Sequence, residues 1–146
     1  MASRTTLFVL LVCVTAAAGV AASSLGEDVT RSEWQLAVFL AVAASVAQLF
    51  VVVTPLNHSY HLSPGLIVAA AILLPPQLIA LVVVCQHVPE WIKVRYPWLI
   101  QTFNIANYAV AGLLASLTFE TVSRVPATNF NGGNARFFVA GVSAAF

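Results

Sequence analysis

The chain has 146 residues, of which 60% are hydrophobic and only 8% are charged, and its formal net charge is +1. In soluble domains about a quarter of all residues are charged, so this composition predicts an integral membrane protein that crosses the bilayer several times. The six lysine and arginine residues are scattered along the chain, so they do not form the basic patch of a nucleic-acid-binding protein. No soluble core can form outside the apolar runs, and we expect one membrane domain over residues 1–146.

The first apolar run covers residues 6–22 and follows a single basic residue, Arg4. We interpret this run as a first transmembrane helix. A short apolar run that ends in small residues is also typical of a cleaved signal peptide, so that alternative stays open. The polar segment after it contains Ser32 and Glu33, which predict a helix start with an acid near the positive end of the helix dipole.

Residues 34–54 form the clearest predicted span, which Pro55 ends. Small residues recur every four positions on one face of this helix, at Ala37, Ala41 and Ser45. Another helix can approach such a face closely, and a homodimer through small-residue faces is one such arrangement. Gln48 extends near the same face, where an interhelical hydrogen bond is favoured over a ligand contact.

The central apolar stretch is interrupted by Pro75 and Pro76. Proline disfavours helical geometry in the residue before it but is accepted in the first turn of a new helix, so we expect short helices over residues 64–74 and 76–88. They form either a hairpin or one broken span. A hairpin places three basic residues on each membrane face, so the positive-inside rule does not choose between the two arrangements. One face would carry Arg4, Lys93 and Arg95, and the other would carry Arg31, Arg124 and Arg136.

Three histidines flank this stretch: His58, His61 and His87. A hairpin brings all three toward one membrane face, and three imidazoles would suit zinc. Solvated loop histidines are common and no other residues have ligand spacing, so we expect no metal site and no cofactor.

Residues 88–98 mix aromatic and basic side chains, which is typical of a connection at the level of the lipid headgroups. Trp34 fits the same role at the start of its own helix. The expected interfacial anchors are therefore Trp34, Trp91, Lys93, Arg95, Tyr96 and Trp98.

Residues 99–119 form the other confident span. Asn104, Tyr108, Gly112 and Ser116 recur every four residues, and Gln101 and Asn107 flank them. Polar groups at membrane depth must find partners, so we expect this face to point into the bundle. It is the best candidate for contact with a ligand or signal, with helix packing as the alternative. With the glutamine of the earlier span, the candidate site residues are Gln48, Gln101, Asn104, Asn107 and Tyr108.

A polar loop over residues 120–136 precedes a final apolar run, 137–146, that is only about 15 Å long as a helix. We therefore expect a chain that is cut inside its next transmembrane helix. The predicted fold class is an all-α polytopic transmembrane helix bundle with a proline-broken short helical hairpin.

Three features resemble the N-terminal membrane region of bacterial cyclic di-GMP signalling proteins of the GGDEF and HD-GYP types. They are the break at Leu74-Pro75-Pro76, the segment Arg95-Tyr96-Pro97-Trp98, and Phe103-Asn104 before a span rich in small residues. The resemblance covers roughly residues 62–119. It implies a sensory or anchoring role in the bacterial inner membrane, and a cytoplasmic segment from Lys93 to Trp98, which favours the hairpin.

The chain departs from that family in its output motifs. Gly132-Gly133-Asn134 lacks the acidic pair of a GGDEF motif, and no His-Asp pair of the HD type occurs. The acids lie at loops or helix ends and form no buried catalytic pair; they are Glu27, Asp28, Glu33, Glu90 and Glu120. We therefore expect no enzyme activity here and place any synthase or phosphodiesterase domain beyond Phe146.

Short helices broken by proline are also similar to the substrate-binding subunits of energy-coupling-factor vitamin transporters. This alternative predicts a small-solute pocket lined by Gln48, Asn104, Asn107 and Tyr108.

Overall fold

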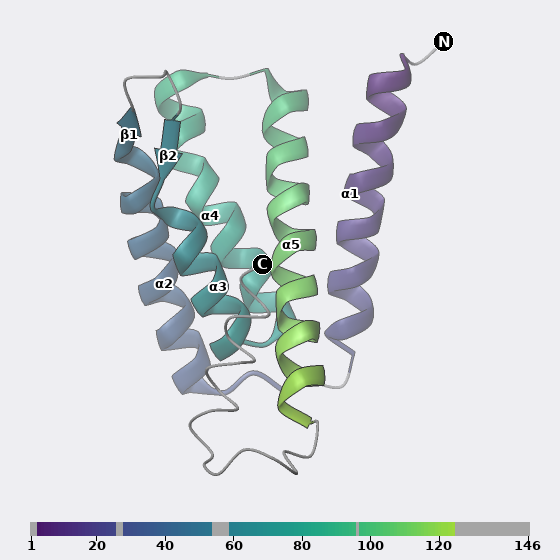
Figure 1. Ribbon diagram of the computed structural model, residues 1–146, viewed down its shortest axis with the longest axis vertical. Coiled ribbons are helices and arrows are strands. Elements are labelled where there is room, and N and C mark those ends of the chain that lie inside the picture. The colour runs from purple at the N-terminus through teal and green to yellow at the C-terminus, as the bar shows by residue number, and fades with distance from the viewer. Residues whose placement is uncertain (1–2, 26–27, 54–58, 96, 125–146) are drawn as a thin grey trace.

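The computed structural model describes residues 3–25, 28–53, 59–95 and 97–124, with only the backbone described for its two short strands and Arg124. Five helices and one strand pair follow in chain order: α1 (Arg4–Ser23), α2 (Arg31–Leu49), β1 (Val51–Val53), β2 (Ser59–His61), α3 (Ser63–Leu73), α4 (Pro76–Val94) and α5 (Trp98–Arg124). Four of the helices, all except α3, are long and apolar enough to cross a bilayer. The expectation of an α-helical bundle is confirmed (Figure 1). The expected last helix, 137–146, lies outside the described residues.

Two helix pairs run parallel. The ring centroids of Phe8 in α1 and Phe103 in α5 are 5.8 Å apart, and a Cβ on Gly19 would lie 3.0 Å from Leu113. An early residue of α1 thus lies beside an early residue of α5 and a later one beside a later one, so these two helices run in the same direction. In the same way α2 and α4 advance together, because Ser45 bonds Cys85 and Gln48 bonds Glu90. Figure 1 shows the N-terminus and the α4–α5 connection at one end of the bundle and the α3–α4 turn at the other.

The proline pair breaks the central stretch into a hairpin, as predicted. Leu74 and Pro75 have extended backbone between α3 and α4. Ser63 precedes Pro75 by 12 residues and Gln86 follows it by 11, yet Gln86 Nε2 donates to Ser63 Oγ at 3.2 Å. Two residues almost equally far from the break can touch only if the chain reverses there.

The second helix of this hairpin is longer than the sequence predicted. We expected it to end at Val88, but α4 continues through Pro89 to Val94. Proline lacks the N–H that would bond the carbonyl four residues earlier, which here belongs to Cys85. The Ser45 hydroxyl of α2 donates to that same carbonyl at 2.9 Å, so the freed acceptor is satisfied by a neighbouring helix and α4 need not stop. The expected connection over residues 88–98 shortens accordingly, with Arg95 in the left-handed conformation as the α4 C-cap.

The predicted helix over residues 34–54 differs at both ends. It begins earlier, because Thr30 and Glu33 form a reciprocal capping box in which each backbone N–H bonds the other side chain. It ends earlier too, at Leu49, and Val51–Val53 pairs antiparallel with Ser59–His61 in the register Val51 to His61. Three consecutive β-branched residues favour a strand, and that signal was present in the sequence.

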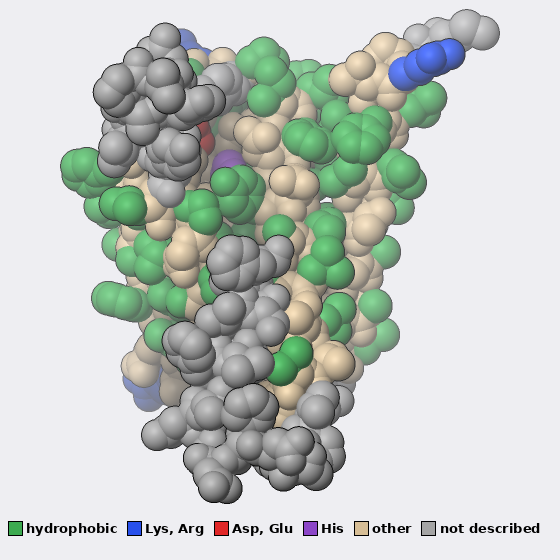
Figure 2. Space-filling model, viewed as in Figure 1, with side chains coloured by type: hydrophobic (Ala, Val, Ile, Leu, Met, Phe, Trp, Pro, Cys, Tyr) green, Lys and Arg blue, Asp and Glu red, His purple; other side chains and the backbone are tan. Residues whose placement is uncertain are grey.

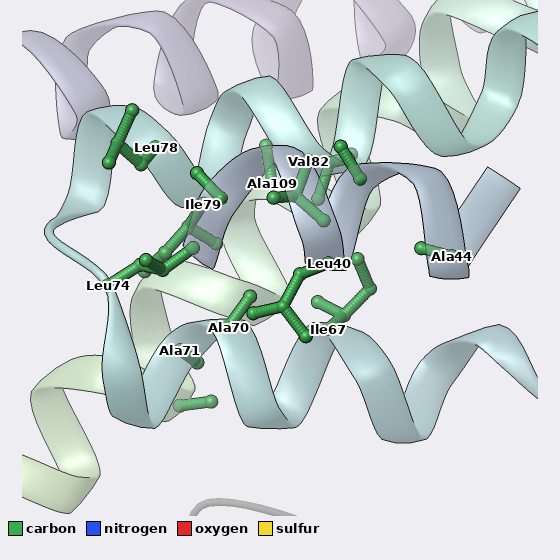
Figure 3. Packing of buried hydrophobic residues seen from close by; sticks show 14 of the residues in the cluster. Leu40, Ala44, Ile67, Ala70, Ala71, Leu74, Leu78, Ile79, Val82 and Ala109 are labelled. Atoms are coloured by element: carbon green, nitrogen blue, oxygen red, sulfur yellow. The ribbon is translucent and has the colours of Figure 1, made fainter. Parts of the chain in front are cut away.

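The core lies between α2, α3, α4 and α5 (Figure 3). Ala37 and Ala41 of α2 are buried and Ser45 bonds Cys85 of α4, so the small-residue face that we expected to accept another helix is covered by helices of the same chain. Helix α1 contributes Ala16 to this core and packs along α5 and, less extensively, α4. Figure 2 shows hydrophobic side chains over the middle of the visible face, with lysine and arginine side chains at its two ends.

Candidate functional site

A group of buried or partly buried polar side chains, here called the interhelical polar cluster, joins three helices. It consists of Gln48 of α2, Ser63 of α3, and Gln86 and Glu90 of α4. The Gln48 amide nitrogen donates to Glu90 Oε2 at 2.6 Å, and its oxygen accepts from the Ser63 hydroxyl and from Gln86 Nε2 at 3.1 Å. One glutamine side chain therefore holds α2, α3 and α4 in one relative position.

The helix ends explain why these four side chains meet. Gln48 is the penultimate residue of α2, and Ser63 is the first residue of α3. Gln86 and Glu90 are four residues apart and share one face of α4. The strand pair connects α2 to α3, so the end of one helix and the start of the next are brought against the same face of α4.

Glu90 carries the only formal negative charge in the cluster. We expected it in a loop, but it lies inside α4, in the last turn but one, and is partly buried. A negative charge near a helix C-terminus gains nothing from the helix dipole. Among the side chains that the structure describes, Gln48 is its hydrogen-bond partner, at 2.6 Å.

A second polar group links α4 to α5. The Gln101 amide donates to the carbonyl of His87 at 3.0 Å, and His87 Nδ1 lies 2.9 Å from the carbonyl of Val83. The ring of Tyr108 meets the His87 ring edge to face, with centroids 5.1 Å apart. The imidazole is 1% exposed, so it is a buried packing partner of α5.

The structure places the five candidate residues differently from one another. Gln48 and Gln101 are buried and hydrogen-bonded, but to separate neighbours. Asn104 and Tyr108 are partly buried on the inward face of α5. Asn107 is exposed, so the expectation that it belongs to the inward face is wrong; it is one residue before Tyr108 and therefore about 100° around the helix.

The cluster contains three residues that the sequence reasoning did not select as site residues: Ser63, Gln86 and Glu90. Gln86 and Glu90 at a spacing of four in an otherwise apolar helix were a usable signal. Because Pro89 lies between them and disfavours a helix, the sequence predicted a connection over this region and not a helix face. Ser63 had no signal, since its role depends on the turn of the chain through the strand pair.

The expected anchors lie at the bundle ends. Trp34, Trp91 and Trp98 are 48%, 49% and 68% exposed, and Lys93 and Arg95 are exposed, while Tyr96 is outside the described residues. His58 is likewise outside them, as is the side chain of His61. Within the described part of the chain no group of three histidine, cysteine or acidic side chains could hold a metal ion.

Three cavities that are lined by described residues lie away from the cluster. One of about 340 Å³ opens beside the α3–α4 turn and is lined in part by Glu33, Pro75, Pro76, Ser116 and Phe119. Another of about 230 Å³ lies beside it, between the ends of α1 and α5. A third, an apolar groove of about 480 Å³, runs between α1, α4 and α5. None of these three is lined by Gln48, Asn104, Asn107 or Tyr108.

No protein-family model, no curated protein and no solved structure matches the chain.

Proposed function

We propose that the chain is a membrane-embedded sensor module of a bacterial signalling protein. The resemblance of residues 62–119 to the membrane region of cyclic di-GMP signalling proteins suggests this class. The observation that carries it is the side chain of Gln48, which links α2, α3 and α4 through buried hydrogen bonds. A network shared by three helices couples their positions, so a change at one helix is passed to the others.

Placement in a bilayer is supported by the four long apolar helices and by the exposure of large apolar side chains along them. Phe8, Leu11, Phe39 and Val42 are all more than half exposed. Such side chains face lipid at no cost, whereas in water they would form a large apolar surface.

The topology that follows is directly testable. Arg4, Lys93 and Arg95 share one end of the bundle and are proposed to face the cytoplasm, as the resemblance implies. Single cysteines replacing Ser3 or Lys93 should react together with a membrane-impermeant maleimide, and cysteines replacing Leu25 or Ser123 should react from the opposite side. The background variant lacks Cys13 and Cys85. Labelling of Ser3→Cys and Lys93→Cys from opposite sides would refute the arrangement.

Sensing is tested with a chimera in which a diguanylate cyclase reporter is fused to the N-terminus, ahead of α1, at the end of the bundle that is proposed to face the cytoplasm. Gln48→Leu removes the bonds between the three helices while keeping the side-chain volume, and it should change reporter output at equal expression. Asn107→Leu is the matched control, because this polar side chain points outward from α5 and makes no cluster contact. Equal output from the original chimera and from Gln48→Leu, with the fold retained, would leave no sensing role for the cluster.

A second candidate function is small-solute binding, as in the transporter subunits. The cavity beside the α3–α4 turn favours it, since about 340 Å³ is within the size range of small-molecule sites. Ser116→Leu would fill that cavity from α5 without touching the polar cluster. Loss of solute uptake in Ser116→Leu, with reporter output unchanged in Gln48→Leu, would select this function over sensing.

A further inference from the structure

One polar atom in the interhelical polar cluster lacks a partner. Gln86 is 0% exposed, and its amide nitrogen donates to Gln48 Oε1 at 3.1 Å and to Ser63 Oγ at 3.2 Å. Its amide oxygen is buried and has no hydrogen-bond partner among the described residues. Buried carbonyl oxygens are almost always satisfied, so this atom points to a ligand that is a hydrogen-bond donor or a cation.

The surroundings select between these two. One turn further along the same face of α4 lies the Glu90 carboxylate, and among the described side chains it has no basic partner. Helices α2 and α4 both end close by, at Leu49 and Val94, and the free carbonyls of a helix C-terminus carry partial negative charge. The N-terminus of α3 contributes the opposite partial charge on one side only. The negative charge and partial charges around Gln86 Oε1 therefore favour a cation over a neutral hydrogen-bond donor.

The oxygen atoms present define the class of cation. The cluster offers carboxylate, amide and hydroxyl oxygens, and within its four described side chains no sulfur or imidazole nitrogen, which suits a hard ion. It holds a single formal negative charge, on Glu90. A monovalent ion neutralises that charge, whereas a divalent ion would leave a net charge in a poorly solvated place.

We propose that the interhelical polar cluster binds one alkali-metal cation through Gln86 Oε1 and the Glu90 carboxylate. In membrane transporters helix C-terminal ends help to coordinate such ions, and α2 and α4 both end beside the cluster. The ion would tie α2, α3 and α4 together. This deepens the proposed function, on which it rests, by naming the ligand of the same cluster.

The experiment uses the purified full chain in detergent at one fixed pH. Binding of radioactive Na⁺ is measured at equilibrium, and thermal stability is compared in NaCl, KCl, LiCl and choline chloride at equal ionic strength. We expect saturable binding of roughly one alkali-metal ion per chain and a higher Tm than in choline. The order of the Na⁺, K⁺ and Li⁺ effects identifies the preferred ion.

The variants assign the site. Glu90→Gln and Gln86→Leu should each weaken binding by roughly tenfold or more and remove the Tm difference between the preferred salt and choline. Gln101→Leu is the matched control, because Gln101 is also a buried glutamine with an unpaired amide oxygen but bonds His87 outside the cluster. It should lower the Tm in every salt and keep the ion-dependent difference. If Glu90→Gln does not fold, Ser63→Ala replaces it and should weaken binding by a smaller factor.

The absence of saturable alkali-metal binding would overturn the proposal, and so would unchanged binding in Glu90→Gln or, if that variant does not fold, in Ser63→Ala. The sensing role fails separately. A reporter chimera that responds to Gln48→Leu, in a chain that binds no ion, keeps the sensor and removes the cation site. Ion binding without any reporter response keeps the site and removes the sensing role.

Discussion

Replacement of Gly112 by alanine tests the packing of α5 on the hairpin of α3 and α4. A Cβ at this position would lie 2.8 Å from Ile79 Cγ2 and 3.6 Å from Ile67 Cγ2. Ile79 is 0% exposed and Ile67 is 4% exposed, so neither side chain has free space to enter. The Cγ2 methyl is the branch of a β-branched residue in a helix, which has one strongly preferred rotamer. The clash therefore has to move a helix.

The expected cost follows from two opposing effects. Overpacking a core typically costs about 1–3 kcal/mol, and alanine regains about 1 kcal/mol of helix propensity over glycine. We expect Gly112→Ala to lower the free energy of unfolding by up to about 2 kcal/mol. Reversible unfolding of the purified chain in detergent by increasing SDS measures it.

Two other glycines provide matched controls. Gly65 of α3 has no atom within 4 Å of the added Cβ, so Gly65→Ala should stabilise the chain by up to about 1 kcal/mol. Gly19 of α1 would meet the flexible tip of Leu113 at 3.0 Å, and its substitution should fall between the other two. Ile79→Leu removes the Cγ2 branch and should rescue Gly112→Ala. Equal tolerance of alanine at positions 112 and 65 would refute the described packing.

Three further predictions concern single contacts. Ser45→Ala should lower the free energy of unfolding by about 0.6 kcal/mol, and at most by about 1.7 kcal/mol, because it leaves the Cys85 carbonyl unpaired. Unfolding in SDS measures the same substitution in a Pro89→Ala background, where the restored N–H of residue 89 can bond that carbonyl and the loss should be smaller. An equal loss in both backgrounds would contradict the pairing. Thr30→Ala should lower the free energy of unfolding by about 1 kcal/mol because it removes the capping box of α2, whereas Thr30→Ser keeps a capping hydroxyl and should change it little. Equal Tm values for the two variants would exclude this cap. Oxidative cross-linking should join Phe8→Cys to Phe103→Cys and not to Leu113→Cys, and the reverse result would show that α1 and α5 are antiparallel.

Much of the fold could be predicted because the features that define membrane helices lie in neighbouring residues of the sequence. A run of apolar residues long enough to cross a bilayer is visible in the sequence, and so is the break at Pro75 and Pro76, where backbone geometry acts on adjacent residues. The burial of Gln48 and Gln101 was also predictable, because a polar side chain in an apolar helix needs a partner. Their partners could not be named.

The tertiary structure alone decided where α4 ends and what the polar side chains bind. Pro89 predicts a helix end when only its neighbours in sequence are considered, but the carbonyl that it frees accepts a hydrogen bond from Ser45, 40 residues earlier. Glu90 joins the cluster only because α4 continues past that proline and α2 lies alongside. Ser63 joins it only because the strand pair returns the chain to the same place. Composition and local backbone preferences therefore determined the class of protein and the existence of its helices. The site depended on contacts between distant segments, which local preferences do not encode.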